Sequence, residues 1–184
     1  MTNQHTQLVS LLRKKSVKVG EFTLASGKKS DFYVDVRQTA LHHDGAELIG
    51  SLILDRLSSD VIGVGGMTLG ADPIACSVVA LSNSQKRPIH GFIIRKEPKG
   101  HGTGKYLVGE GNLPKGSKVC MVEDTTTTGG SLITAIERAQ DAGLDVVQCI
   151  TIVDREEGAQ AALTAAGYSL DALTTRTELL AASE

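Results

Sequence analysis

The sequence of 184 residues has no tryptophan, and aromatic residues make up only 3% of it. Proteins that bind single-stranded nucleic acid stack bases on aromatic side chains, so this scarcity argues against such a role. An excess of one charge is also missing, because 19 Lys and Arg stand against 21 Asp and Glu, for a net charge of -2. No global basic field therefore draws the protein to nucleic acid. Any anion-binding chemistry must be local.

Long hydrophobic runs are absent as well. No apolar stretch approaches the ~20 residues that cross a bilayer, and the polar start of the chain lacks the charged and apolar regions of a secretory signal. The three cysteines, Cys76, Cys120 and Cys149, show no metal-ligand spacing, and their odd number does not indicate a disulfide framework. We expect buried free thiols in a cytoplasmic protein that binds neither membrane nor nucleic acid.

Apolar runs alternate with helical segments, an order typical of an α/β sheet. Residues 146–153 are nearly all apolar, as in a parallel strand covered on both faces. The expected elements are a hairpin within 21–37, helices at 8–15, 44–56, 70–81, 132–142 and 156–166, and strands at 61–64, 88–95, 119–122, 146–153 and 170–173. Asp44 is the expected N-cap of its helix. We predict one domain over residues 1–184, with an N-terminal helix and hood (1–40) and an open, mostly parallel twisted sheet with helices on both faces (41–184).

The most informative segment, residues 119–131, leads from a strand into a helix. Its apolar part ends at two carboxylates, Glu123 and Asp124. The residues that follow carry hydroxyls or are glycines: Thr125, Thr126, Thr127, Thr128, Gly129, Gly130 and Ser131. Glycines let the backbone turn tightly, and the N–H groups at a helix start bind anions. Carboxylates beside a phosphate cradle suit a phosphorylated sugar. The alternative, an ordinary capped strand-to-helix turn, does not explain the paired acids.

Two other nucleotide-binding motifs are excluded. Residues 102–106 read Gly-Thr-Gly-Lys-Tyr, which lacks both the leading glycine of a P-loop and the hydroxyl residue after its lysine. No GxGxxG follows the first strand of a βαβ unit. The sequence therefore indicates neither a P-loop NTPase nor a dinucleotide enzyme.

At residues 119–131 the sequence resembles the type I phosphoribosyltransferases and their signature for 5-phosphoribosyl 1-diphosphate (PRPP). Several base specificities share that signature, so it indicates only the donor. Three further segments narrow the resemblance to the orotate phosphoribosyltransferase family: 22–30, 95–102 and 154–158. The resemblance covers about residues 20 to 160 and implies the type I phosphoribosyltransferase fold.

The resemblance implies transfer of the 5-phosphoribosyl group from PRPP to orotate, giving orotidine 5'-monophosphate and pyrophosphate. The implied cofactor is Mg2+, held mainly through PRPP and water and not by direct protein ligands. Glu123 and Asp124 would hold the ribose hydroxyls, and residues 125–131 would surround the 5'-phosphate. Asp124 would also be catalytic, together with Lys99 and His101.

A basic segment would stabilise the leaving group, pyrophosphate. Arg95, Lys96, Lys99 and His101 would place positive charge where negative charge develops on pyrophosphate. In this family the segment closes over the site and reaches the neighbouring subunit of a homodimer, which the resemblance implies for Lys96, Lys99 and His101. A solvated surface hairpin is the alternative.

The acceptor side depends on Arg155, which directly follows an apolar strand. A planar guanidinium matches a carboxylate in two parallel hydrogen bonds, and orotate carries a ring carboxylate. An ion pair with Glu156 or Glu157 at a helix start is the alternative. By resemblance Thr127 also contacts orotate. Tyr33, from the hood, could stack on the pyrimidine, although a core tyrosine is the other interpretation.

Two lysines that many family members carry are missing from this sequence. Ala25 stands at the position of one, and the Gly-Gly-Met-Thr stretch around Met67 lacks the other. Lys28 or Lys29 could compensate. Two other functions stay open: a phosphoribosyltransferase for another base, which does not need Arg155, and a non-catalytic PRPP-sensing regulator. The regulator should carry a nucleic-acid-binding appendage, which this sequence does not show.

Overall fold

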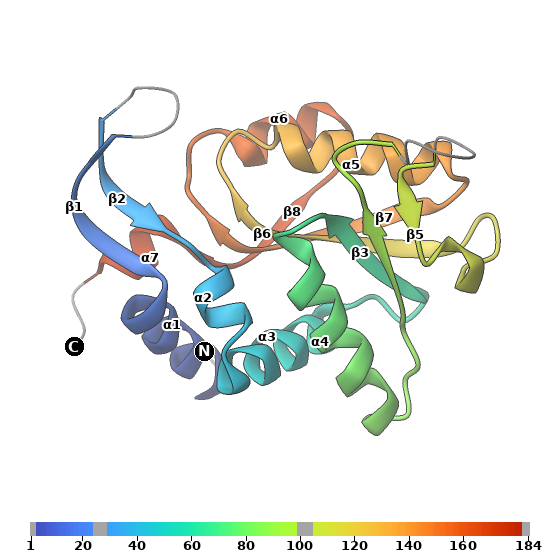
Figure 1. Ribbon diagram of the computed structural model, residues 1–184, viewed down its shortest axis with the longest axis horizontal. Helices are drawn as coiled ribbons and strands as arrows, with labels where there is room; N and C mark the ends of the chain where they lie inside the picture. Colours follow the sequence, from blue (N-terminus) through green and yellow to red (C-terminus); the bar gives the residue numbers. More distant parts are fainter. Residues whose placement is uncertain (1–2, 24–28, 99–104, 182–184) are drawn as a thin grey trace.

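The computed structural model describes residues 3–23, 29–98 and 105–181 of the chain (Figure 1). The helices are α1 (Asn3–Lys15), α2 (Arg37–Ala40), α3 (His43–Arg56), α4 (Ala71–Ser84), α5 (Gly130–Asp141), α6 (Ala159–Ala165) and α7 (Arg176–Leu180), with a 3-10 turn at Glu110–Asn112. The strands are β1 (Val17–Thr23), β2 (Lys29–Val34), β3 (Gly63–Met67), β4 (His90–Ile94), β5 (Leu107–Val108), β6 (Lys118–Thr126), β7 (Asp145–Asp154) and β8 (Leu170–Thr175).

Six of the strands form one sheet in the spatial order β5-β4-β3-β6-β7-β8. All neighbouring pairs in it are parallel except β4 with the short edge strand β5. β1 and β2 form a separate antiparallel hairpin, which stands to one side of the sheet, at the left of Figure 1. The predicted mostly parallel sheet with a small N-terminal hairpin is confirmed.

Helices cover both faces of the sheet, as predicted. Helices α1, α3 and α4 pack on one face, where Ile49 and Ile74 are fully buried, and α5 and α6 pack on the other through Leu132 and Leu163 (Figure 1). Because successive side chains of a strand point to opposite faces, a central strand in such a sheet must be apolar on both.

Strand β6 shows this requirement directly. Cys120 and Val122 belong to the core on the α3–α4 face, whereas Val119 and Met121 belong to the core on the α5–α6 face, and all four are fully buried. Their burial anchors the strand whose carboxyl end carries the acidic pair.

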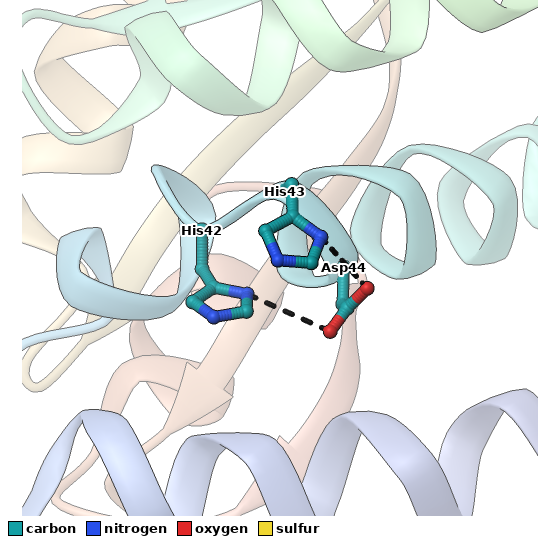
Figure 2. A group of neighbouring side chains, drawn as sticks. All are labelled: His42, His43 and Asp44. Carbon is teal, nitrogen blue, oxygen red and sulfur yellow. Dashed lines mark ion pairs between the residues drawn. The ribbon is translucent and has the colours of Figure 1, made fainter.

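The prediction that Asp44 caps its helix is wrong by two residues. Helix α3 begins at His43, and His42 has the extended backbone of the N-cap. Figure 2 shows the Asp44 carboxylate directed toward both imidazoles, 2.9 Å from His43 Nδ1 and 3.8 Å from His42 Nδ1. An acid in the first turn stabilises the positive end of the helix dipole without acting as the cap. Asp44 therefore serves the same terminus from inside the helix.

Some other expectations also need correction. Helix α2 and strand β5 were not predicted, because elements of four and two residues show no periodicity. Cys120 and Cys149 are buried as expected, and burial raises the pKa of Cys149 to about 12. Cys76 is exposed, because it lies on the outer side of α4. Within the described residues, no helix is long and apolar enough to cross a membrane.

Candidate functional site

The carboxyl ends of the central strands border a cavity of about 250 Å³. Ligands of open α/β sheets bind at this edge. The cavity is lined by Arg37, Met67, Thr68, Leu69, Gly70, Lys96, Glu123, Asp124, Thr125 and Ser131. Acidic side chains from β6 and basic side chains from the start of α2 (Arg37) and from just beyond β4 (Lys96) thus converge where the sequence predicts the donor substrate.

A second, smaller cavity of about 90 Å³ adjoins the first and is formed by the turn from β6 into α5. It is lined by Glu123, Thr125, Thr126, Thr127, Thr128, Gly129, Gly130, Ser131 and Leu132. The predicted phosphate cradle of residues 125–131, which we call the phosphate nest, is a concave surface, and its cavity shares Glu123, Thr125 and Ser131 with the larger one.

The backbone at Gly129 makes this nest possible. Gly129 is the N-cap of α5 and has a φ of 84°, in the left-handed region that favours glycine. A Cβ there would lie 2.8 Å from Leu163 Cδ2, so a larger residue would also disturb the α5–α6 packing. The first helical hydrogen bond runs from Ile133 N–H to the Gly129 carbonyl. The N–H groups before Ile133 have no partner inside the helix and can bind an anion.

The acidic pair is held in an environment that disfavours charge. Burial, and then the neighbouring charge of Asp124, raise the pKa of Glu123 to about 8. Burial also raises the pKa of Asp124. Thr125 N–H donates to Asp124 Oδ1 at 2.7 Å, but Glu123 Oε2 is buried with no hydrogen-bond partner among the described residues. Such an oxygen needs a donor, and a sugar hydroxyl supplies one.

Two cations stand near the pair. Lys96 lines the larger cavity, and its charge opposes the rise in the pKa of Glu123. Arg37 lines the same cavity, and its charge acts in the same way on Asp124. A hydrogen bond of 2.8 Å from Arg37 Nε to Asp35 Oδ1 positions the guanidinium. Arg37 was not predicted, because its only signal is a position shortly after the hairpin.

The other predicted cations have different positions. Arg95 is exposed and does not belong to the described lining of either cavity. Lys99 and His101 lie outside the described residues, as do Ala25 and Lys28. Lys96 faces the cavity of its own chain.

The loop after β3 forms a wall of the larger cavity, and at Gly70 it lies against the acidic pair. Met67, in the stretch where the family resemblance implies a lysine, lines the cavity. A Cβ at Gly70 would lie 2.6 Å from the Asp124 carboxylate, so the glycine permits this close approach. The Thr68 hydroxyl donates to Asp72 Oδ2 at 2.7 Å and fixes the loop to α4. All lining residues of this wall are therefore uncharged.

Arg155 lies beside the nest at the end of β7. Its backbone N–H donates to the Thr126 carbonyl at 2.9 Å. Its side chain is only 13% exposed, and Nη2 lies 2.8 Å from Glu157 Oε1. The ion pair considered as the alternative is thus present, but Arg155 Nε is buried without a hydrogen-bond partner in the described part of the chain. One side of the guanidinium retains hydrogen-bonding capacity.

The aromatic ring near Arg155 is Phe32. Its centroid lies 5.9 Å from the Arg155 guanidinium carbon, and the side chain is fully buried. Tyr33, which the sequence suggested for stacking, is the next residue of β2 and is 38% exposed. Since adjacent side chains of a strand point to opposite faces, the two residues serve different surfaces. Thr127 lines the nest, and its carbonyl accepts from Ala159 N–H at 3.1 Å.

Among the described residues, a single group of His, Cys, Asp and Glu brings its ligand atoms together, and it consists of His42, His43 and Asp44 (Figure 2). It lies at the start of α3, where the positive end of the helix dipole disfavours a cation. This arrangement gives no reason to place a metal there.

Comparisons with known proteins show what this chain is similar to. The sequence matches no family model. It is 43% identical to an orotate phosphoribosyltransferase of Rhodopirellula baltica, over 91% of this chain and 90% of that protein. It is 44% identical to one of Mycobacterium tuberculosis, over 88% of each. The crystal structure of the M. tuberculosis enzyme in complex with PRPP has a TM-score of 0.78 at 35% identity, covering 96% of this chain and 98% of that one.

Proposed function

The chain belongs to the orotate phosphoribosyltransferase family, and on that premise we propose a role for each site residue in the reaction. The enzyme transfers the 5-phosphoribosyl group of PRPP to orotate, which gives orotidine 5'-monophosphate and pyrophosphate in pyrimidine biosynthesis. The proposal rests on the acidic pair near the end of β6. The cavity at this pair adjoins the anion-binding start of helix α5. These two features bind opposite ends of one sugar phosphate.

The donor lies across the two cavities. Its 5'-phosphate accepts hydrogen bonds from the N–H groups and hydroxyls of residues 125–131, the predicted nest. Its ribose hydroxyls donate to Glu123 and Asp124, which supplies the partner that Glu123 Oε2 lacks. When the C1–O bond to pyrophosphate breaks, the ribose gains oxocarbenium character. The Asp124 carboxylate then stabilises that positive charge, which is its catalytic role.

The leaving pyrophosphate occupies the side of the larger cavity that carries positive charge. Lys96 and Arg37 stand there, and Arg95, Lys99 and His101 add charge according to the family resemblance. The oxygen-rich lining of carboxylates and hydroxyls fits Mg2+, which keeps several waters and binds through phosphate oxygens. When bound, Mg2+ neutralises charge on the diphosphate. It is held mainly through PRPP and water, with no dedicated protein ligand.

Orotate binds at the Arg155 guanidinium, next to Thr127. The orotate carboxylate accepts two hydrogen bonds from the guanidinium, including one from the Nε that has no acceptor in the described structure. Glu157 competes for the same guanidinium, so binding exchanges one carboxylate for another. Uracil has no carboxylate and makes no such exchange.

The first experiment follows the ultraviolet absorbance of orotate when the purified protein is mixed with PRPP and Mg2+. We expect orotate to be consumed, and a chelator to stop the reaction because the diphosphate charge is no longer neutralised. Readdition of Mg2+ should restore the rate. Undiminished turnover in the presence of chelator would contradict the proposed cofactor.

We also propose a homodimer in which Lys99 and His101 complete the site of the neighbouring subunit. Lys96 was expected to reach across with them, but its position in its own chain's cavity favours a role there. Free thiols at Cys76, Cys120 and Cys149 support the proposed cytoplasmic location.

Mixing two inactive variants tests the shared site. Lys99→Ala and Asp124→Asn proteins should each be at least about tenfold slower than the wild type, since each lacks a charge that acts in the transition state. After subunit exchange, a heterodimer regains one site with both residues intact, and activity should return to roughly a quarter of the wild-type rate, because half the dimers are mixed and each has one such site. Verified exchange without recovery would show that Lys99 acts within its own chain.

A further inference from the structure

One arginine outside both cavities contacts residues at the ends of β3 and β4 and just before β5. Arg138 lies on α5, the helix whose first turn forms the phosphate nest. Its Nη1 donates to the Arg95 carbonyl at 2.7 Å, just beyond β4. The same nitrogen lies 3.6 Å from the sulfur of Met67, the last residue of β3. Its guanidinium carbon lies 4.0 Å from the centroid of the Tyr106 ring, just before β5.

The Arg95 carbonyl is the important contact. That carbonyl belongs to the peptide unit that joins Arg95 to Lys96, so the hydrogen bond fixes the backbone from which the Lys96 side chain departs. On the other side, Arg95 N–H donates to the Tyr106 carbonyl at 2.8 Å. Arg138 therefore contacts both strands of the β4–β5 hairpin at its last rung.

We propose that Arg138 is a positioning residue for the phosphoribosyl transfer, which orients Lys96 and Met67 toward the leaving group by fixing the ends of β3, β4 and β5 to α5. The inference rests on the proposed function, because it uses the pyrophosphate side of that site. A flat guanidinium can stack on a ring and donate in its own plane at once, and lysine cannot reproduce both interactions. Because helix α5 is rigid, it holds Lys96 at a fixed position relative to the phosphate nest at its own first turn.

The expected kinetic signature distinguishes positioning from general destabilisation. Charge on the leaving pyrophosphate grows in the transition state, so misplacing Lys96 should affect kcat most. A displacement of about 1 Å can cost as much as 100-fold in rate. Orotate binds near Arg155, on the other side of the acidic pair, and its KM should change little.

The test compares Arg138→Met with Glu137→Ala, a control at the exposed neighbour on the same helix. We expect kcat of Arg138→Met to fall at least about tenfold, with the orotate KM within threefold and thermal melting still cooperative. Arg138→Lys should have an intermediate kcat. Tyr106→Leu, which removes the ring, should lower kcat in the same direction. The double variant Arg138→Met/Tyr106→Leu should lose less than the product of the two single effects, because both act through one contact.

A kcat for Arg138→Met equal to that of Glu137→Ala would overturn the inference, as would equal losses in kcat and in orotate affinity. If Arg138→Met does not fold, Tyr106→Leu and Arg138→Lys decide: folded protein with wild-type kcat in both contradicts the role, and a reduced kcat supports it. Failure of the wild type to use orotate would contradict the proposed function itself, a result distinguishable from either of these.

Discussion

Replacing Arg155 with methionine is expected to raise the orotate KM about 100-fold, because a charge-assisted bidentate hydrogen bond contributes roughly 3 kcal/mol. Methionine keeps the length of the side chain and can pack against Phe32, so the fold should persist. PRPP affinity should stay within twofold, since Arg155 does not belong to the described lining of the donor cavities. Steady-state kinetics with each substrate varied in turn measures both effects.

Glu157→Gln is the matched control for this prediction. Glu157 is the present partner of Arg155, and its replacement removes a competitor for the guanidinium. The orotate KM of Glu157→Gln should therefore stay the same or fall. If Arg155 serves only the ion pair at the start of α6, both variants should change stability alike and leave the orotate KM unaltered. That outcome would contradict the proposal that Arg155 binds the carboxylate of orotate.

Replacing Glu123 with glutamine is expected to stabilise the folded protein at alkaline pH and to lower its turnover rate. The pKa of Glu123 rises from 4.5 to about 8 on folding, chiefly through burial. Below pH 4.5 the group is protonated in both the folded and unfolded states. Between pH 4.5 and 8 the unfolded state loses the proton first, so the free energy of unfolding falls as the pH rises. Above pH 8 the folded state contains a buried carboxylate whose desolvation the charge of Lys96 offsets only in part.

Glutamine has the same shape without the charge. The free energy of unfolding of the Glu123→Gln protein should therefore not fall with rising pH through this group. Thermal melting from pH 5 to pH 9 should show equal Tm values at the acid end, and a Tm several degrees higher for Glu123→Gln at the alkaline end, corresponding to roughly a few kcal/mol. Glu137→Gln, at an exposed acid on α5, controls for net charge. Turnover of Glu123→Gln should fall at least about tenfold. Parallel Tm curves for the wild type and Glu123→Gln would contradict the unfavourable burial of this carboxylate.

The position of the proposed donor site could be predicted because its signals are local. Glu123, Asp124 and the residues up to Ser131 are consecutive, and the change from an apolar strand to glycines and hydroxyls specifies a strand-to-helix turn at the carboxyl edge of a sheet. The structure places all of them on two adjoining cavities. The position of Arg155 at the same edge could be predicted for the same reason, since it directly follows the next strand of the sheet.

What could not be predicted depends on contacts between distant segments. Arg37 reaches the acidic pair from the end of the hairpin, and Arg138 reaches Arg95 across 43 residues, and neither contact has a local pattern. For Arg95 the sequence indicated the side-chain charge, whereas the structure engages its carbonyl. Which of the adjacent residues Phe32 and Tyr33 lies near Arg155 depends on which face of β2 is buried. A shift of one residue along the strand reverses that face.

The central claim is that this chain joins a phosphoribosyl donor site to an acceptor site built for a carboxylate. It is tested most directly by the initial rates of PRPP consumption with orotate, uracil and adenine as separate acceptors at equal concentration. We expect turnover with orotate at least about 100-fold faster than with either other base, matching the interaction that Arg155 provides. Equal or faster turnover of uracil or adenine would contradict the assignment of Arg155, and no turnover of any base by protein that still binds PRPP would identify a regulator.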